Sequence, residues 1–298
     1  MSVLFRVLAS GSSGNCSVLG LHDQRLLIDC GLSVRALTAR LTAAGLDWSQ
    51  IRAAVLTHIH DDHWKETALG EFVRRGIRLH CHPEHAAWLS DKSPAFNKLA
   101  DRGLVMVYRT GKRFEPLSDV GCQAFDVAHD AGATCGFRFD GELNAPAKNW
   151  SIGYAADLGC WDDRTVFALA DVDLLALEFN HDVPLQWATG RPAFLVQRII
   201  GDQGHLSNEQ AAELLTRILR VSQPGRVRQV VQLHLSREAN RPELARRAAA
   251  LAIQNYAFEQ GLPAGRPVPR CAVHTACQHE PSPPFVRTVA AAESLVGQ

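Results

Sequence analysis

The 298-residue sequence has no excess of either charge and no long apolar run. Lys plus Arg and Asp plus Glu number 31 each, so the formal net charge is zero at pH 7. A balanced charge argues against a strongly basic coat for nucleic acid, although it leaves room for a local basic groove. No apolar run reaches the length of a membrane span, so we predict no membrane partner.

A secretory signal and a disulfide framework are also missing. The segment Met1–Ala9 is apolar, but it is too short and too weakly charged for a secretory signal. The eight Cys are scattered without a spacing typical of disulfides. Reduced thiols and a cytoplasmic location are therefore the simpler expectation.

The apolar residues that are present, 46% of the chain, are enough for a sizeable core. Alternation and short apolar runs predict strands at 3–9, 16–19, 25–28, 53–56, 78–81, 104–108, 120–128, 134–139, 149–155, 173–178, 228–233 and 272–274. Helical periodicity and caps predict helices at 33–44, 65–75, 83–89, 191–200, 207–221 and 242–260. Residues 90–118 are less regular, and Gly141–Lys148 reads as a turn. Hairpins come first and β-α units later, which predicts sheets covered by helices.

The densest set of metal-competent side chains follows the predicted strand 53–56. His58, His60, Asp62 and His63 lie within six positions, and Asp61 adds a second carboxylate. Buried polar groups need partners, and imidazoles with carboxylates are good ligands for a borderline divalent cation. We expect His58 and His60 on one side of the loop and Asp62 and His63 on the other. That arrangement suits two cations better than one.

Five predicted strands end in metal-competent residues, at 58–63, 129–130, 157, 180–182 and 234, which predicts a site at one sheet edge. His129 is the best candidate for a third ligand of the first cation. His234 is the best candidate to join Asp62 and His63 at the second. Asp157 is predicted to bridge the two cations. His129 could instead be a surface His at a strand end, and Asp157 taken alone could be just a turn residue.

In this order, these ligands resemble the metal-binding motifs of the metallo-β-lactamase superfamily. Five further segments resemble the WalJ/YycJ-type branch of this superfamily. They are Leu8-Ala-Ser-Gly-Ser-Ser-Gly-Asn15, Leu27-Ile-Asp-Cys-Gly31, Glu178-Phe-Asn-His-Asp182, Gly204-His-Leu-Ser-Asn208 and His234-Leu-Ser236. The resemblance runs from Leu4 to Glu243 and leaves the tail uncovered. It implies an α/β fold, the four-layered αββα metallo-β-lactamase sandwich, with a dinuclear site. Residues 1–260 would form this hydrolase domain, and 261–298 a C-terminal extension with one strand and a mobile tail.

The resemblance also implies a chemistry. Gly204-His-Leu-Ser207 and His234-Leu-Ser-Arg237 are similar to segments of tRNA 3′-processing endonucleases, where the first supplies a proton-donating His and the second a ligand His. The implied activity is metal-dependent phosphodiester hydrolysis, and the WalJ branch implies a 5′-to-3′ exonuclease with DNA as substrate. One departure is Glu66, where many members carry Gly. It should alter loop packing more than ligation.

The predicted mechanism uses two divalent cations, zinc or manganese, which lower the pKa of a shared water and hold phosphate oxygens. Asp62 can ligate one cation and orient the resulting hydroxide. His205 is the first candidate for the proton donor to the leaving oxygen, although it could merely cap the helix that follows. His181 is the second candidate, and it could instead order a loop or contact substrate.

Substrate contacts are predicted at Ser12, Ser13, Asn15, His181 and Ser207. The Gly11–Asn15 loop offers hydroxyl and backbone N–H groups that suit a phosphate, but a plain tight turn explains it nearly as well. A group of arginines could follow a nucleic-acid backbone, although Arg residues on helices are more often just solvated. These are Arg191, Arg198, Arg237 and Arg241.

Three alternatives stay open. The residues Cys271, His274, Cys277 and His279 have ligand types for a structural zinc, but in a strand ligands three apart point to opposite faces, so coincidence is the better expectation. The same catalytic site could serve a small-molecule phosphodiesterase or thioesterase. A non-catalytic regulatory metal-binding protein is a further alternative, which the seven intact ligand positions argue against.

Overall fold

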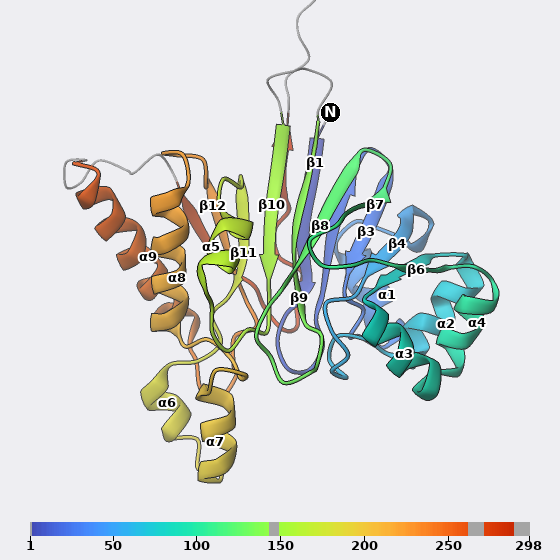
Figure 1. Cartoon of the computed structure of the whole chain (residues 1–298), viewed down its shortest axis with the longest axis horizontal. Helices are drawn as coiled ribbons and strands as arrows, with labels where there is room; N and C mark the ends of the chain where they lie inside the picture. The colour runs from blue at the N-terminus through green and yellow to red at the C-terminus, as the bar shows by residue number, and fades with distance from the viewer. Residues whose placement is uncertain (1, 143–148, 262–270, 289–298) are drawn as a thin grey trace, which may run out of the picture.

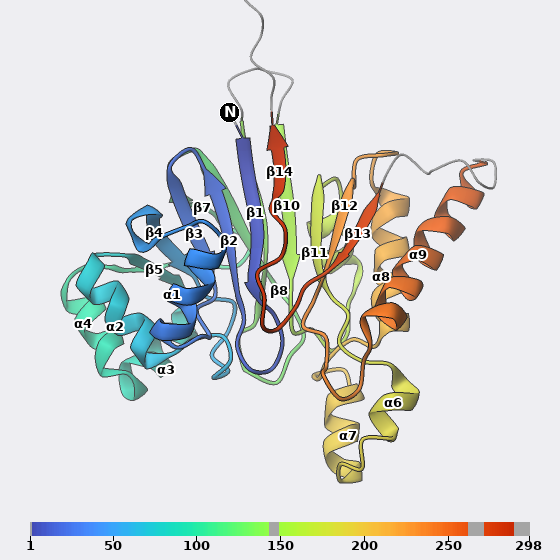
Figure 2. The same cartoon turned by 180° about the vertical axis from the view of Figure 1, so that it is seen from behind.

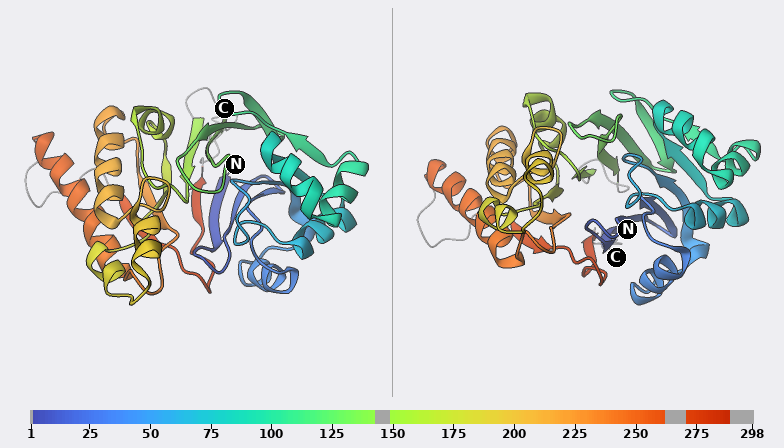
Figure 3. Two further views of the ribbon diagram at one scale, coloured as in Figure 1. Left: turned by 60° about the horizontal axis from the view of Figure 1, so that its bottom comes forward. Right: turned by 90° about the horizontal axis from the view of Figure 1, so that it is seen from below.

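The computed structural model describes residues 2–142, 149–261 and 271–288. Two β-sheets face each other, and helices cover the outer side of each sheet (Figure 1). Seen from below, the two helical layers lie on opposite sides of the molecule (Figure 3). The predicted four-layered αββα sandwich is confirmed.

The first sheet combines hairpins with parallel strands. In spatial order it contains β14 (Phe285–Thr288), β1 (Ser2–Ala9), β2 (Cys16–Leu21), β3 (Gln24–Ile28), β4 (Ile51–Val55), β5 (Arg78–Cys81) and β6 (Val105–Val107). The pairings from β14 to β3 are antiparallel, and those from β3 to β6 are parallel. Figure 2 shows β14 beside β1.

The second sheet repeats this pattern. In spatial order it contains β7 (Arg113–Leu117), β8 (Val120–Asp126), β9 (Cys135–Glu142), β10 (Asn149–Ala155), β11 (Leu174–Glu178), β12 (Gln229–Leu233) and β13 (Ala272–Thr275). The pairings from β7 to β10 are antiparallel, and those from β10 to β13 are parallel. The carboxyl ends of parallel strands meet at one edge of a sheet, where ligand sites commonly form.

The helices divide between the two outer faces. The first sheet is covered by α1 (Val34–Ala43), α2 (Glu66–Arg75), α3 (Pro83–Lys92) and α4 (Pro94–Asp101), with the short 3-10 helix η1 (Trp48–Gln50) before β4. The second is covered by α5 (Asp163–Leu169), α8 (Asn208–Val221) and α9 (Pro242–Glu259). The remaining pair, α6 (Val183–Trp187) and α7 (Ala193–Ile200), projects from the end of the molecule at which β10 ends (Figure 1). Within the described ranges, none of these helices has the length and apolar character needed to cross a membrane.

Strand alternation explains how one sheet serves two cores. In β3, Leu26 and Ile28 face the second sheet, whereas Leu27 faces the helices. Phe5 and Tyr154, from opposite sheets, meet edge to face in the central core with ring centroids 6.5 Å apart. Both faces of the sheet are covered, so β2 is buried throughout and the last three residues of β3 are buried.

Several short elements differ from the sequence prediction. Residues 90–118 contain α4, β6 and β7, where one strand was expected, and α5 and α6 were not predicted. These helices have eight residues or fewer, too short for a clear helical period, and their ends depend on local caps such as Ser93 and Asp162. The C-terminal extension adds two strands instead of one, β13 to the second sheet and β14 to the first. In the predicted turn Gly141–Lys148, the first two residues belong to β9, and the remainder lies outside the described residues, as does the predicted mobile tail after residue 288.

Candidate metal centre

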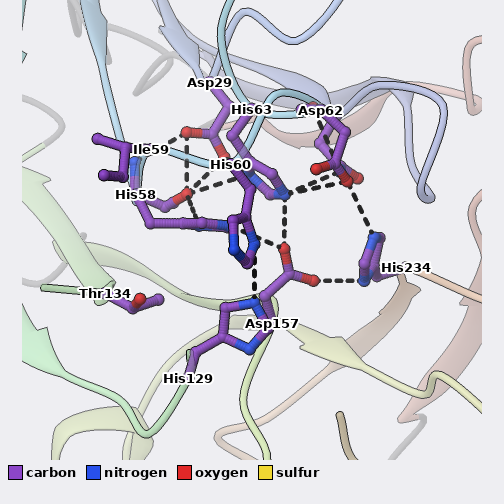
Figure 4. Close-up of polar contacts among 12 residues, drawn as sticks. Asp29, His58, Ile59, His60, Asp62, His63, His129, Thr134, Asp157 and His234 are labelled. Atoms are coloured by element: carbon purple, nitrogen blue, oxygen red, sulfur yellow. Dashed lines mark hydrogen bonds and ion pairs between the residues drawn. The ribbon is translucent and has the colours of Figure 1, made fainter. Parts of the chain in front are cut away.

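The polar residues that follow β4, β8, β10 and β12 meet at one edge of the sandwich (Figure 4). Two groups of side chains each place their ligand atoms within 4.8 Å of one another. The first is His58, His60 and His129, and the second is Asp62, His63, Asp157 and His234. The structure therefore brings together all seven residues that the sequence indicated as ligands, in the two groups expected.

The first group is formed by imidazoles. Nε2 of His129 lies 3.2 Å from Nδ1 of His60. Nδ1 of His129 donates a hydrogen bond of 2.9 Å to the carbonyl oxygen of Gly204. A carbonyl can only accept, so the proton sits on Nδ1 and the lone pair of Nε2 faces His60. This is the tautomer that a metal ligand needs.

The second group surrounds the buried carboxylate of Asp157. Oδ2 of Asp157 lies 2.5 Å from Nε2 of His63 and 3.3 Å from Nε2 of His58. Its other oxygen contacts Nδ1 of His234. Oδ2 of Asp62 lies 3.5 Å from Nε2 of His234 and 3.6 Å from Nε2 of His63. Asp157 therefore touches members of both groups, as a bridging carboxylate must.

Two buried carboxylates that the sequence analysis did not single out orient the imidazoles. Asp29, which follows β3, accepts a hydrogen bond of 2.8 Å from Nδ1 of His63 and is itself held by the hydroxyl of Thr57. Glu178, the last residue of β11, accepts one of 3.0 Å from Nδ1 of His234. A carboxylate on the second ring nitrogen fixes the tautomer and leaves Nε2 for a cation. Both acids lie in segments that resemble the WalJ/YycJ-type branch, and each comes at or just after the end of a strand, which was the available signal.

Glu178 also holds His205. Nδ1 of His205 donates a hydrogen bond of 2.8 Å to Oε1 of Glu178, the same oxygen that faces His234. The other oxygen accepts from the backbone N–H groups of Leu158 and Leu206. Glu178 and His205 form, together with Asp157 and His234, a third group that could hold a metal. Nε2 of His205 makes no hydrogen bond to the described residues and the side chain is 21% exposed, so this nitrogen can reach a bound substrate.

The backbone is left-handed at three strand ends in the centre. Asp29, Asp157 and His234 have φ angles of 62°, 57° and 54°. Such conformations cost non-glycine residues roughly 1–3 kcal/mol each, and they persist where the surrounding structure holds them. Here the turn lets each side chain leave its strand and point into the centre instead of the sheet faces.

Burial and neighbouring charges shift the pKa values of the carboxylates and imidazoles in the centre. Burial raises the pKa of the Asp157 carboxyl, but the imidazoles of His234 and His63 outweigh it and hold that pKa well below its usual range. Burial also raises the pKa of Glu178, and His205 reverses this shift and brings it to about 2. For His58, burial prevails and lowers the pKa well below its ordinary value. Burial lowers the pKa values of His63 and His234, but Asp157 and the neighbouring carboxylates outweigh it and raise the pKa of His63 to about 10 and that of His234 well above its ordinary value. The centre therefore contains ionised carboxylates beside the neutral imidazole of His58, and a cation that binds must displace the protons of His63 and His234.

A pocket of about 170 Å³ opens over the centre. Its lining residues are Ser12, His60, Asp62, His129, Asp130, Asp157, Arg198, Ile199, Gly204, His205 and His234. Five of the seven candidate ligands thus line the pocket, namely His60, Asp62, His129, Asp157 and His234. A substrate in the pocket would contact the candidate ligands and His205 together.

The predicted substrate contacts separate into two sets. Ser12 is exposed and lines the pocket, and Ser13 is exposed with its backbone N–H bonded to Gln278. Asn15 is buried, and its amide donates to Oδ2 of Asp62 at 3.1 Å. Ser207 is buried and caps α8 in the predicted capping box with Gln210.

His181 lies apart from the pocket. It is fully buried, and neither ring nitrogen has a hydrogen-bond partner within the described part of the chain. Its backbone carbonyl accepts from Asn208, at the start of α8. His181 is not among the pocket-lining residues.

The four arginines that could follow a nucleic-acid backbone differ in whether they line the pocket. Arg198 lines the pocket and donates to Asp130 at 2.5 Å. Arg191 pairs with Glu238, Arg241 donates to backbone carbonyls, and Arg237 is exposed. Only Arg198 among these four is part of the pocket wall.

The two remaining motifs lie away from the centre. Glu66 accepts from the backbone N–H of Ala95 at 2.8 Å and from the Ser93 hydroxyl, so it ties the start of α2 to the start of α4. Among the described residues, no candidate ligand group includes the C-terminal Cys271, His274, Cys277 or His279. All eight cysteines are described, and each is a free thiol.

Residues 24–234 match the family model described as the β-lactamase superfamily domain. The chain belongs to the metallo-β-lactamase superfamily. Its four-layered fold and its clustered His and Asp ligands agree with this membership and indicate divalent-metal binding. The prediction of a hydrolase of this superfamily is confirmed.

Relatives within the superfamily point to the same branch. Exodeoxyribonuclease WalJ of Streptococcus pneumoniae is 31% identical over 242 residues, which cover 81% of this chain and 84% of that protein. Exodeoxyribonuclease YycJ of Bacillus anthracis is 28% identical over 261 residues, covering 88% and 93%. Among solved structures, the short form of human tRNase Z matches with a TM-score of 0.58 at 16% identity, covering 97% of this chain and all of that one. The predicted resemblance to the WalJ/YycJ branch, with tRNA-processing enzymes as structural neighbours, is confirmed.

Proposed function

We propose that this metallo-β-lactamase superfamily enzyme is a phosphodiesterase with two divalent cations, and that it degrades DNA from the 5′ end. The observation that carries the proposal is the contact of Asp157 with both ligand groups beneath one pocket. Two relatives that cover most of the chain are exodeoxyribonucleases by name, which supports DNA as the substrate class. Unpaired thiols throughout the chain support a cytoplasmic location.

The donor atoms suit cations. Nε2 of His58 and Nε2 of His234 are buried and have no hydrogen-bond partner among the described residues. Buried polar atoms are otherwise almost always satisfied, so atoms of this kind fit metal ligation. His58, His60 and His129 would hold one cation, and Asp62, His63 and His234 the other, with Asp157 shared. The imidazoles favour zinc, and the carboxylates leave manganese open.

The chemistry divides between the cations and the protein. Two divalent cations, when bound, lower the pKa of a water and offset charge on the phosphate. Asp62 sits at the pocket surface, where its free oxygen can orient the attacking water. His205 supplies the proton to the leaving oxygen from Nε2. Burial lowers the pKa of His205, but Glu178 and Asp157 outweigh that effect and raise it, so the imidazole is held protonated for this step.

The proposal assigns substrate contacts by position. Ser12 contacts a phosphate, because its side chain is exposed in the pocket wall. Ser13 flanks it on the same loop. The side chains of Asn15 and Ser207 are engaged within the protein, so they act by positioning Asp62 and α8. We assign His181 no contact with substrate. Its proposed role is to order the segment between β11 and α8, which was the alternative to a proton donor.

The test is a nuclease assay with end-labelled DNA. Purified protein with Mn²⁺ or Zn²⁺ is given oligonucleotides that carry a 5′ phosphate and a label at either end. We expect the 5′ label to leave first as short products, while the 3′ label remains in a shortening ladder. Early release of the 3′ label would overturn the direction. Turnover of small phosphodiesters or thioesters alone would favour the small-molecule alternative, and two bound metals without any turnover would favour the regulatory one.

A further inference from the structure

The arm formed by α6 and α7, residues 183–200, carries exposed aromatic rings. Trp187 at the end of α6 is 50% exposed, and Phe194 near the start of α7 is 73% exposed. The arm projects beyond the two sheets at the end of the molecule at which β10 ends (Figure 1), and Asp157 of the metal centre comes just after β10. Val196 on the same helix is buried, so α7 packs on one side and leaves the other to solvent.

The exposed side of α7 leads to the pocket. Phe194, Gln197 and Arg198 are all exposed, and their spacing of three and four residues places them on one helix face. Arg198 lines the pocket with the candidate ligands, and Ile199 beside it does the same. Phe194 lies one turn away, about 6 Å along the helix axis. An aromatic ring therefore lies one helical turn from Arg198 in the pocket wall.

The charge on this face suits an anionic strand. The Arg198 side chain is 61% exposed, and its partner Asp130 lies at the pocket wall. The sequence of α7, Ala193–Ile200, contains no acidic residue. A phosphate that enters the pocket can accept hydrogen bonds from the N–H groups of Arg198 that Asp130 does not use, because a guanidinium offers more donors than a single carboxylate needs.

We propose that this arm binds the single-stranded part of the DNA substrate, with a base stacked on Phe194 and its neighbouring phosphate held by Arg198. The inference rests on the proposed nuclease function and adds to it a site for the strand outside the metal centre. Stacking on an aromatic ring tolerates any base, as an exonuclease that removes successive nucleotides of any sequence requires. Trp187 provides a second ring on the same arm. The exposed face of α7 presents the ring of Phe194, the amide of Gln197 and the guanidinium of Arg198. This mixture of groups fits a nucleotide chain better than an apolar protein surface.

The test measures binding apart from turnover. Fluorescence anisotropy in EDTA follows a labelled single-stranded oligonucleotide binding to the full-length protein, without cleavage. We expect Phe194→Ala and Phe194→Leu both to weaken binding by roughly 5- to 150-fold, the range for loss of one stacked base, and Phe194→Trp to retain it. Arg198→Gln should lower the slope of log Kd against log salt by about 0.7, the value for one phosphate on a single strand. Phe258→Ala is the matched control, because Phe258 is 80% exposed at the far end of α9.

Kinetics with added Mn²⁺ separate this inference from the proposed function. If the wild type does not cleave DNA, the proposed function fails, whether or not it cleaves bis(p-nitrophenyl) phosphate. If it cleaves DNA and Phe194→Ala binds and cleaves DNA like the wild type, the arm has no role in binding the strand. Retained binding in Phe194→Leu would show a general apolar contact and would overturn stacking. A wild-type dimer in sedimentation that Phe194→Ala dissociates would identify the arm as a contact between copies and would also overturn it.

Discussion

The side-chain amide of Asn15 donates a hydrogen bond of 3.1 Å to Oδ2 of Asp62, and the backbone N–H of Asn15 donates to the Asp62 carbonyl at 2.7 Å. Two loops that are distant in sequence are thus joined at the metal centre. Gly31 completes the contact, because a Cβ there would lie 1.7 Å from the Asp62 carbonyl oxygen. The glycine-rich loop before β2 therefore positions a candidate ligand as well as facing the pocket.

Asn15→Ala should weaken metal binding. Loss of a hydrogen bond that orients a ligand typically lowers metal affinity about 10- to 100-fold. Competition with a chromophoric zinc chelator measures the change. The control is Gln278→Ala, since Gln278 bonds the backbone of the same loop at Ser13 and Gly14 and has no bond to Asp62. Equal zinc affinity in wild type and Asn15→Ala would show that the Asp62 carboxylate needs no such support.

His205→Ala should bind both metals and lose turnover. The loss of a positioned proton donor reduces kcat by about 10²- to 10⁴-fold. Glu178→Gln should also lower kcat, because the amide no longer holds His205 in its protonated, oriented form. Metal content and kcat on DNA are measured side by side. Full turnover by His205→Ala would move the proton-donor role to another group that lines the pocket.

Stability should depend on pH through His80, which lies in β5 away from the centre. It is buried, its Nε2 has no partner among the described residues, and its ring stacks on Phe114. Burial, with a smaller effect of Arg78, lowers the pKa of His80 to about 4. The unfolded chain takes up this proton near pH 6.5, whereas the folded chain resists it until about pH 4, so stability falls as pH decreases through that window.

The expected effect is about 3 kcal/mol at and below pH 4. His80→Phe removes the titrating group and keeps a ring to stack on Phe114, so its free energy of unfolding should fall less between pH 6.5 and 4. Urea unfolding in EDTA measures both proteins without interference from metal binding. His85, whose pKa burial also lowers to about 4, serves as a second site for comparison. Parallel pH curves for wild type and His80→Phe would contradict the assignment.

Long periodic elements and dense ligand motifs were predictable from sequence. The capping box at Ser207 and Gln210 correctly marked the start of α8, and the structure divides His58 to His63 between two groups of metal-competent atoms, as their spacing had indicated. Both signals are local, since they depend on residues a few positions apart. The pairing of His129 and His234 with separate groups followed from their positions after apolar strands.

What the sequence did not reveal depends on contacts between distant segments. Asp29 and Glu178 orient imidazoles 34 and 56 residues away, so no spacing rule could identify them as partners. β14 forms only by pairing with β1 at the other end of the chain. Asn15 was predicted to contact substrate because the Gly11–Asn15 loop offers hydroxyl and backbone N–H groups that suit a phosphate, but its side chain is buried and donates to Asp62.

The most direct measurement compares Asp62→Ala with Asp61→Ala and the wild type. The two aspartates are adjacent, but Asp62 belongs to a ligand group, whereas Asp61 is exposed and belongs to none of those found in the described residues. Bound metal is counted by atomic emission after purification with Mn²⁺ or Zn²⁺, and nuclease activity is measured on 5′-phosphorylated DNA. Our account predicts that Asp62→Ala loses metal and nuclease activity together, while Asp61→Ala retains both. Nuclease activity in Asp62→Ala equal to that of the wild type would contradict the proposed metal centre.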